Sequence, residues 1–539
     1  MDVFRPAIER WLVAASVALA AWLVVAMLWE GDWRALVLVR NTLLLACGAC
    51  GVAIPIGAAL AFLLLRTDAP GRRFACGLAG TMLLVPLYLQ AAGWDAGFGR
   101  QGWLPVASGA PGLEGWAAAI WVHGVAATPW VILIVGVGIR LVEPELEEAA
   151  LLETTPWNAF LRVTLSRSFP WLAVAAAWIL VTTAGEITVT DLYQVRTYAE
   201  EVYTHVPLRN DSSDAAGTWL LGAPRGVLLV GALIVCSLAA TARVAPAELA
   251  TTERDREVFR LGPYRPLALV GLAGAGAVIV GVPLANLVYQ AGLVVRPAGD
   301  QWLRGWSGGK LLWLVGTTPG RYAEEWMWSL AIGGASATAA VGLGAVLAWP
   351  ARRGGLKALP ALAIAAVGLA LPGPTIGLQL IGLLNRESSD LLLWLYDRTI
   401  LAPLLAQLVR SLPIAILVCW HALRSVPEEL LDAAALEGAG GAVCFWRVVI
   451  PQRAASLAAA WLAALAISVG DLSASILVLP PGVTTIPVRV FGLLHSGVDD
   501  QVAGIGLTLA IAFAALAELA IALWRRGGGA VRQAGGQRV

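Results

Sequence analysis

Residues 424–437 read RSVPEELLDAAALE, and residues 140–153 read RLVEPELEEAALLE. The two stretches align at a constant offset of 284 residues, so that an acidic residue followed by two alanines stands at Glu148 and again at Asp432. Alanine-rich composition alone seldom reproduces charges and prolines at one fixed spacing. The chain therefore contains an internal repeat.

The repeat extends through most of the chain. Downstream, where one residue is missing from the first copy, an offset of 285 aligns Glu186 with Asp471. Upstream, an offset near 287 aligns Arg66 with Arg353. We predict a first repeat at residues 1–245, a linker at 246–261 and a second repeat at 262–539.

The composition is typical of a membrane protein. Of the 539 residues, 58% are hydrophobic and 14% are charged, and the mean hydropathy is +0.75. The 58 glycines suit closely packed helices, and the 24 tryptophans suit an interfacial belt. A soluble enzyme and a disordered chain are excluded. The formal net charge of +1 gives no reason to expect nucleic acid as a partner.

A helix needs about 20 apolar residues to cross a bilayer, and each repeat contains six such stretches. The candidates in the first repeat are 11–29, 38–65, 74–92, 115–139, 170–190 and 217–242. Those in the second are 266–290, 326–349, 358–384, 399–423, 455–479 and 501–524. Most Lys and Arg residues then lie on the side of both termini, which predicts cytoplasmic N- and C-termini. We expect an all-α polytopic membrane protein of about twelve helices, with both repeats oriented alike in the lipid bilayer.

Each repeat carries its acidic-Ala-Ala element between the fourth and fifth spans. We name these segments the first loop (residues 143–167) and the second loop (residues 427–451). The second loop begins with Pro-Glu-Glu, which suits a helix N-terminus, and Gly438 and its neighbouring glycines interrupt the helix. One such helix–turn–helix could be an ordinary amphipathic connector. Two at equivalent places favour docking elements for a two-fold or pseudo-two-fold partner.

The second loop resembles the EAA motif of permease subunits of ABC importers, which ends in Leu/Ile-Pro. In that family the motif forms coupling helices that seat in two ATP-binding subunits. The first loop departs from the pattern, with Thr154 in place of the glycine and Ser166 in place of the proline. The matching residues are Glu148, Ala149 and Ala150 in the first loop and Asp432, Ala433, Ala434, Gly438, Ile450 and Pro451 in the second.

Further stretches are similar to the fused, two-copy permeases of ferric-iron importers. They are residues 185–204, 371–386, 396–413 and 470–494. The resemblance implies the transmembrane subunit of an ABC importer in the cell inner membrane. It would move a solute, with ferric iron as the first expectation, delivered by a periplasmic binding protein. Thiamine, aminoethylphosphonate and polyamine permeases are near relatives, so these cargoes stay open.

The same resemblance implies that the chain is not itself an enzyme. ATP would bind to the separate subunits, so no catalytic residue and no cofactor are expected in this chain. The nearest phosphate-loop candidate, residues 305–311, has too few residues between its glycines and no Ser or Thr after Lys310. Cys47 and Cys50 form a CxxC inside an apolar helix, which indicates helix packing. The four histidines have no ligand spacing, and no metal site is expected.

Three charged residues are candidates for the translocation path. Glu186 and Asp471 occupy equivalent places at the outer ends of the fifth spans. They could be solvated at the membrane surface, or line a path or gate between the repeats. Arg410, within the tenth span, could face the bundle interior beside an acid or extend its charge to the interface.

Two other classes of protein were weighed. A secondary transporter can also have twelve spans in two parallel halves. It would need ionisable residues near the bilayer midplane, and it gives no reason for the duplicated loops. A membrane scaffold or signalling component would be expected to carry a soluble domain. The paired loops favour the importer over both.

Overall fold

The computed structural model describes residues 33–100, 102–109, 111–205, 259–298, 301–386 and 388–535. These residues form helices and one two-stranded hairpin. The first repeat contains α2 Trp33–Arg66, α3 Arg72–Met82, α4 Leu87–Phe98, α5 Trp103–Ser108, α6 Gly115–Arg140, α7 Pro144–Glu153, α8 Pro156–Ala159, the π-helical turn η1 Phe160–Leu165, α9 Ser166–Ala184, α10 Thr188–Leu192 and α11 Tyr198–His205.

The second repeat begins with η2 Gly262–Tyr264, α14 Arg265–Gly276, η3 Ala277–Gly281 and α15 Val282–Gly292, followed by strands β1 Leu293–Ala298 and β2 Gln301–Trp306. It continues with α16 Gly308–Arg321, α17 Ala323–Ala351, η4 Gly355–Ala358, α18 Leu359–Ala370, α19 Gly373–Leu384, α20 Asp390–Arg398 and α21 Leu401–Arg424. It ends with α22 Glu428–Leu436, α23 Gly441–Cys444, η5 Phe445–Val449, α24 Ile450–Gln452, α25 Ala454–Val469, α26 Ile486–His495 and α27 Asp499–Gly535.

The helices confirm an all-α polytopic membrane protein, apart from the hairpin. Seven helices of the described residues are long and apolar enough to cross a membrane, and three bent helix pairs would raise the number to ten. Each of these ten corresponds to one expected span. The other two expected spans, 11–29 and 217–242, lie outside the described residues.

Three spans that we expected to be continuous helices are broken. The axis turns by 105° between α3 and the segment that begins with α4, and by 103° between α18 and α19. Pro86 and Pro372 stand at these two breaks, with ψ of 147° and 143°. A proline lacks the N–H that would continue the preceding helix, so each starts a new one. The expected span 455–479 is also too long, because α25 ends at Val469 and residues 470–485 form turns.

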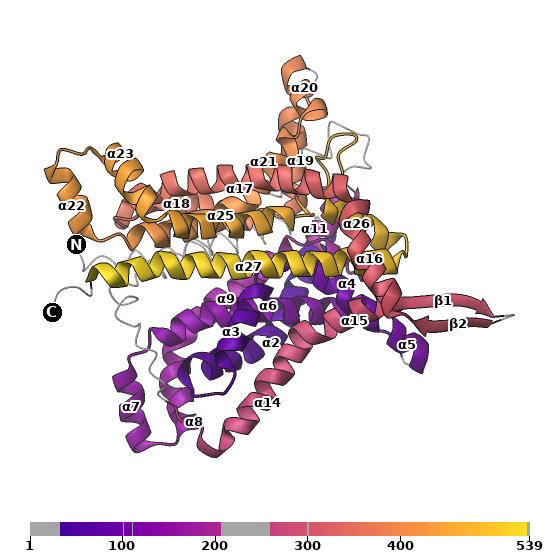
Figure 1. Cartoon of the computed structure of the whole chain (residues 1–539), viewed down its shortest axis with the longest axis horizontal. Coiled ribbons are helices and arrows are strands. Elements are labelled where there is room, and N and C mark those ends of the chain that lie inside the picture. Colours follow the sequence, from indigo (N-terminus) through magenta and orange to yellow (C-terminus); the bar gives the residue numbers. More distant parts are fainter. Residues whose placement is uncertain are drawn as a thin grey trace.

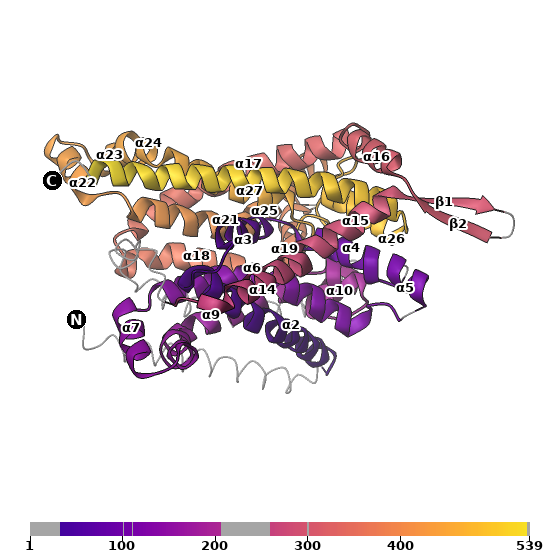
Figure 2. The ribbon, with the colours of Figure 1, turned by 60° about the horizontal axis from the view of Figure 1, so that its bottom comes forward.

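The long helices run between two ends of the molecule (Figure 1). Helices α7 and α22 lie at one end, and the hairpin β1–β2 projects from the other in both ribbon views (Figure 2). The hairpin is antiparallel, with Val295 opposite Arg304. The two acidic loops are therefore at the same end.

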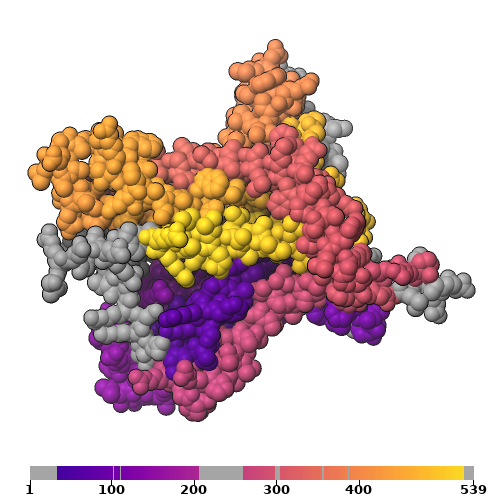
Figure 3. All heavy atoms as spheres, viewed as in Figure 1, coloured from indigo at the N-terminus to yellow at the C-terminus, as the bar shows by residue number. Residues whose placement is uncertain are grey.

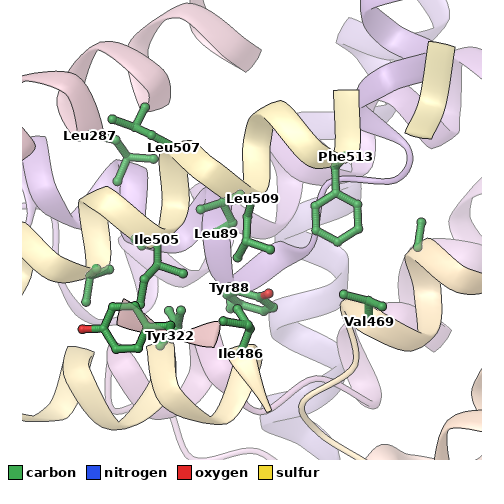
Figure 4. Packing of buried hydrophobic residues seen from close by; sticks show 14 of the residues in the cluster. Tyr88, Leu89, Leu287, Tyr322, Val469, Ile486, Ile505, Leu507, Leu509 and Phe513 are labelled. Atoms are coloured by element: carbon green, nitrogen blue, oxygen red, sulfur yellow. The ribbon is translucent and has the colours of Figure 1, made fainter. Parts of the chain in front are cut away.

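The first helices of the second repeat pack against the first repeat. The Asn286 side chain of α15 donates a hydrogen bond to the Gly93 carbonyl of α4 (2.9 Å), and it accepts one from the Trp103 indole (3.2 Å). The close-up in Figure 4 shows Leu287 of α15 beside Leu507 of α27, and Leu89 of α4 beside Leu509, all within one buried cluster. In the space-filling view α27 runs along the surface between the two repeats (Figure 3). The core is thus shared by both repeats.

Candidate functional site

Helices α7 and α22 present equivalent side chains to solvent. Leu152 and Leu436, which align at the offset of 284, are each 90% exposed. Exposed apolar side chains at the same place on two helices are typical of a contact surface. Glu148 and Asp432 are also exposed, one helical turn before these leucines.

The two loops turn differently after these helices. Gly438 follows α22 with φ of +81°, and its N–H donates to the Ala435 carbonyl (3.0 Å). This left-handed geometry ends a helix readily only with glycine. Helix α7 ends instead at an extended Thr154, with φ of −144°, and the Thr155 hydroxyl caps α8. The first loop has one residue fewer between Glu153 and Phe160 than the second has between Glu437 and Phe445, and its extended connection needs no glycine at Thr154.

The first loop is anchored by a buried ionic network. The Thr164 hydroxyl donates to Glu147 (2.6 Å), and the Arg66 Nε lies 3.4 Å from the same carboxylate. Arg66 Nη2 also donates to the carbonyls of Ile139 and Val142, each at 2.7 Å. Burial raises the pKa of Glu147, while Arg66 and Thr164 act in the opposite direction.

The second loop has no counterpart to this carboxylate. Leu431 occupies the equivalent position and is buried with Phe445 and Val449 in an apolar cluster. Of the other motif residues of the second loop, Ile450 packs beside this cluster, while Pro451 is exposed in α24. The two loops thus reach a similar placement by different contacts.

Glu186 and Asp471 follow α9 and α25 directly, and each is paired with a cationic or titratable side chain. Glu186 lies 3.7 Å from His123 of α6 and accepts hydrogen bonds from the backbone N–H groups of Thr188 (2.6 Å) and Val189 (2.9 Å). Its side chain is 14% exposed. Glu186 is therefore not a fully solvated acid at the surface.

Asp471 has an equivalent environment. It lies 3.7 Å from Arg410 of α21, and its side chain is 4% exposed. The Ser475 N–H donates to its carboxylate at 3.1 Å. Arg410 thus faces an acid inside the bundle. A buried charge is costly without a partner. Each acid is paired with a side chain of the fourth span of its own repeat, Glu186 with α6 and Asp471 with α21.

The residues just before these acids contact the opposite repeat. A Cβ atom on Gly185 would lie 3.5 Å from Pro372 Cα, and one on Gly470 would lie 2.8 Å from Pro86 Cγ. The Gly373 N–H also donates to the Gly185 carbonyl across the boundary (3.4 Å). In each repeat, the end of the fifth span therefore contacts the proline at which a span of the other repeat is broken. This reciprocal contact is the candidate gate.

A second cross-repeat contact lies between α10 and α26. His495 Nε2 is 2.8 Å from the Asp191 carboxylate, and Nδ1 is 2.8 Å from the Phe491 carbonyl. Both neighbours only accept hydrogen bonds, so the geometry suits a doubly protonated imidazolium. The hydrogen bond to Asp191 raises the pKa of His495, and partial burial opposes it.

Several features that the sequence singled out have packing roles. Lys310, in the phosphate-loop candidate, donates to the Leu293 carbonyl (2.7 Å) and pairs with Asp500 (3.0 Å). Cys50 lies within α2, with its sulfur 3.9 Å from the Ala176 carbonyl. Within the described ranges, no group of three or more His, Cys, Asp or Glu side chains could hold a metal ion.

Some residues of this site were not predicted from the sequence. Leu152 and Leu436 could have been found, because they match at the same offset as the acidic-Ala-Ala elements. The proline breaks could also have been found by aligning the third spans. Glu147 and His123 carry no such signal, since their partners are distant in sequence.

Comparison with known proteins connects part of this geometry to a family. Residues 340–525 match the family described as "Binding-protein-dependent transport system inner membrane component". They include the second loop, Arg410 and Asp471. Similar curated proteins are the putrescine transport system permease protein PotI of Escherichia coli K12 and that of E. coli O6:H1. Each is 29% identical over 176 residues, which is 32% of this chain and 62% of the relative.

The chain thus aligns with less than two thirds of the length of these relatives. The spans are those of a multi-pass membrane protein, and the matched family is described as an inner membrane component. The first loop lies outside the matched residues, in keeping with its departures at Thr154 and Ser166.

Proposed function

We propose that the chain is the transmembrane permease subunit of an ATP-driven, binding-protein-dependent importer. The observation that carries the proposal is the pair of equivalent helices α7 and α22 at one end of the molecule, each with a leucine that is 90% exposed. The first and second loops would each receive one ATP-binding subunit on the cytoplasmic side. The family match over residues 340–525 supports this reading.

The mechanism follows from two conformations of the boundary between the repeats. We take the reciprocal Gly–Pro contacts as the closed conformation of that boundary. ATP binding by the partner subunits would move α7 and α22, and the attached α9 and α25 would separate these contacts. Substrate would then meet a path that opens alternately to each side. The chain itself supplies binding surfaces and a gate, while ATP chemistry takes place on the partners.

The exposed leucines provide the first test. The chain is co-expressed with its ATP-binding subunit, and the complex is purified in mild detergent. The ATP-binding subunit is recognised in the purified sample by its ATPase activity. Leu152→Ser or Leu436→Ser should each weaken recovery of that subunit, and the double variant should lose it. Leu391→Ser is the matched control, because Leu391 is exposed on α20, away from both loops. Full recovery with the double variant would overturn the proposal.

A cation is the cargo that the comparisons favour. The matched relatives are named as putrescine permeases, so a polyamine is the first candidate for this chain. Ferric iron was the first expectation from sequence resemblance, and these relatives do not support it. Uptake of radiolabelled putrescine, compared with ferric iron, by cells with and without the chain distinguishes the two cargoes.

Glu186 and Asp471 are proposed to belong to the gate. The double change Glu186→Gln and Asp471→Asn keeps their shape but removes both charges. We expect uptake to fall about tenfold or more, because a change of about 1.4 kcal/mol in a conformational equilibrium has this effect. Recovery of the ATP-binding subunit should be unchanged. Normal uptake by the double variant would remove these acids from the gate.

A further inference from the structure

The end of the linker between the repeats is docked on the first repeat. Phe259 is buried, and its N–H donates to the Arg66 carbonyl at the end of α2 (3.1 Å). A parallel β-bridge joins it to Thr67. Two residues later, the Leu261 N–H donates to the Asp68 carboxylate (2.8 Å). The last residues before α14 therefore have a fixed place beside α2.

An aromatic cluster connects this docked segment to the first loop. The ring of Phe62 in α2 lies 5.1 Å from that of Phe259, at 64° between the planes. The same ring lies 4.2 Å from that of Phe160, at the start of η1 in the first loop. Trp157 extends the cluster, with its ring 5.7 Å from Phe160. Phe62 thus contacts both the linker and the first loop.

The second repeat has an equivalent aromatic pair, but its third contact is made by an arginine and not by an aromatic ring. Trp349 takes the place of Phe62 and Phe445 that of Phe160, and their rings are 5.4 Å apart. Arg352, the residue that follows α17, lies over the Trp349 ring at 4.1 Å. The aromatic side chain equivalent to Phe62 therefore contacts a cation at the end of α17, whereas Phe62 contacts the ring of Phe259.

Arg66 links the docked segment to the ionic network of the first loop. Its backbone carbonyl binds Phe259, while its side chain binds Glu147 and the carbonyls at the end of α6. The first loop lacks the glycine turn that follows α22. It is held instead by two sets of contacts that both pass through the end of α2.

We propose that Phe259 is a positioning residue for the first loop. Phe259 packs against Phe62, which in turn contacts Phe160 of the first loop. Movement of α7 is thereby transmitted to α2, although the first loop lacks the glycine turn. The first loop is then a working coupling element with its own means of support. The role in transmitting movement rests on the function proposed above, whereas the role in holding the loop does not.

Hydrogen–deuterium exchange of the full chain in detergent tests the holding role without any partner. Phe259→Ala should raise exchange in residues 144–165 by roughly two- to tenfold, the range that loss of an aromatic pair implies. Residues 428–449 should be unchanged. Phe259→Leu, which keeps apolar volume, should restore most of the protection. Arg352→Ala is the matched control and should raise exchange in residues 428–449 alone.

The transmitting role is tested in the reconstituted complex with its ATP-binding subunit. Phe259→Ala should leave recovery of that subunit intact but lower the amount of putrescine moved per ATP hydrolysed, and Phe259→Leu should restore the ratio. Unchanged exchange in residues 144–165, or an equal rise in both loops, would overturn the positioning role. Failure of the wild-type chain to bind an ATP-binding subunit would overturn the proposed function, and the exchange experiment would still decide the holding role.

Discussion

Gly438 shows how one backbone angle separates the two loops. Its φ of +81° is unfavourable for any residue with a Cβ atom. Gly438→Ala should therefore destabilise the end of α22 by about 1 kcal/mol, seen as faster hydrogen exchange in α22. Thr154→Ala is the matched change in the first loop, where φ is −144°, and should have little effect on exchange in α7. Equal effects at both positions would contradict this account.

His495 makes one contact between the repeats dependent on pH. Its pKa is raised in the folded chain, chiefly by the hydrogen bond to Asp191. The stabilisation is therefore complete below about pH 6.5, the ordinary pKa of histidine, and is lost as the pH rises through the raised value. Thermal unfolding in detergent should show the largest difference between wild type and His495→Gln near pH 6. The difference should shrink steadily at alkaline pH, and a constant difference would contradict the pairing.

At the scale of the element, the first loop depends on an ion pair where the second depends on apolar packing. Glu147→Leu copies Leu431 of the second loop but leaves the Arg66 guanidinium buried without its carboxylate. Loss of one partner of a buried pair costs about 3 kcal/mol or more, so α7 should lose most of its exchange protection. Adding Arg66→Leu should recover much of it. If the double variant is no better protected than Glu147→Leu, the pair does not hold the loop.

The same comparison explains why the first loop can depart from the family pattern. A helix that ends in a left-handed turn needs glycine, whereas the first loop, which lacks one residue between Glu153 and Phe160, passes from α7 to α8 in extended conformation. The absence of glycine at Thr154 therefore follows from a different connection. In both loops a π-helical turn, η1 or η5, then leads into the fifth span.

For the whole molecule, the proposal is that the reciprocal Gly–Pro contacts define the closed boundary. In a cysteine-depleted chain, Gly470→Cys with Pro86→Cys should form a disulfide on mild oxidation, and so should Gly185→Cys with Pro372→Cys. Either crosslink should block uptake until a reductant is added. Gly470→Cys with Gly438→Cys is the control, because α25 separates these positions. Absence of both crosslinks would contradict the observed packing of the repeats.

Much of the architecture was predictable from local sequence patterns. The ten expected spans between residues 38 and 524 each correspond to a helix or a bent helix pair. Where the prediction was wrong, at the third, ninth and eleventh spans, a proline or a run of turns interrupts an apolar stretch. Hydropathy measures how apolar a segment is, and it does not report whether the helix axis continues through it.

The sequence by itself determined the internal repeat, the membrane-spanning class and the two acidic loops. These depend on composition and on residue spacing along the chain, both of which can be read without knowing which segments meet. It also predicted that Glu186 and Asp471 are equivalent. It did not determine what those acids contact.

Only the tertiary structure decided those contacts. It paired Asp471 with Arg410, set Gly470 against Pro86 of the other repeat, and placed Phe259 beside the first loop. It also showed that α15 of the second repeat packs against α4 of the first repeat. The physical reason is that these contacts join residues far apart in the chain and depend on the angles at which broken helices turn and pack.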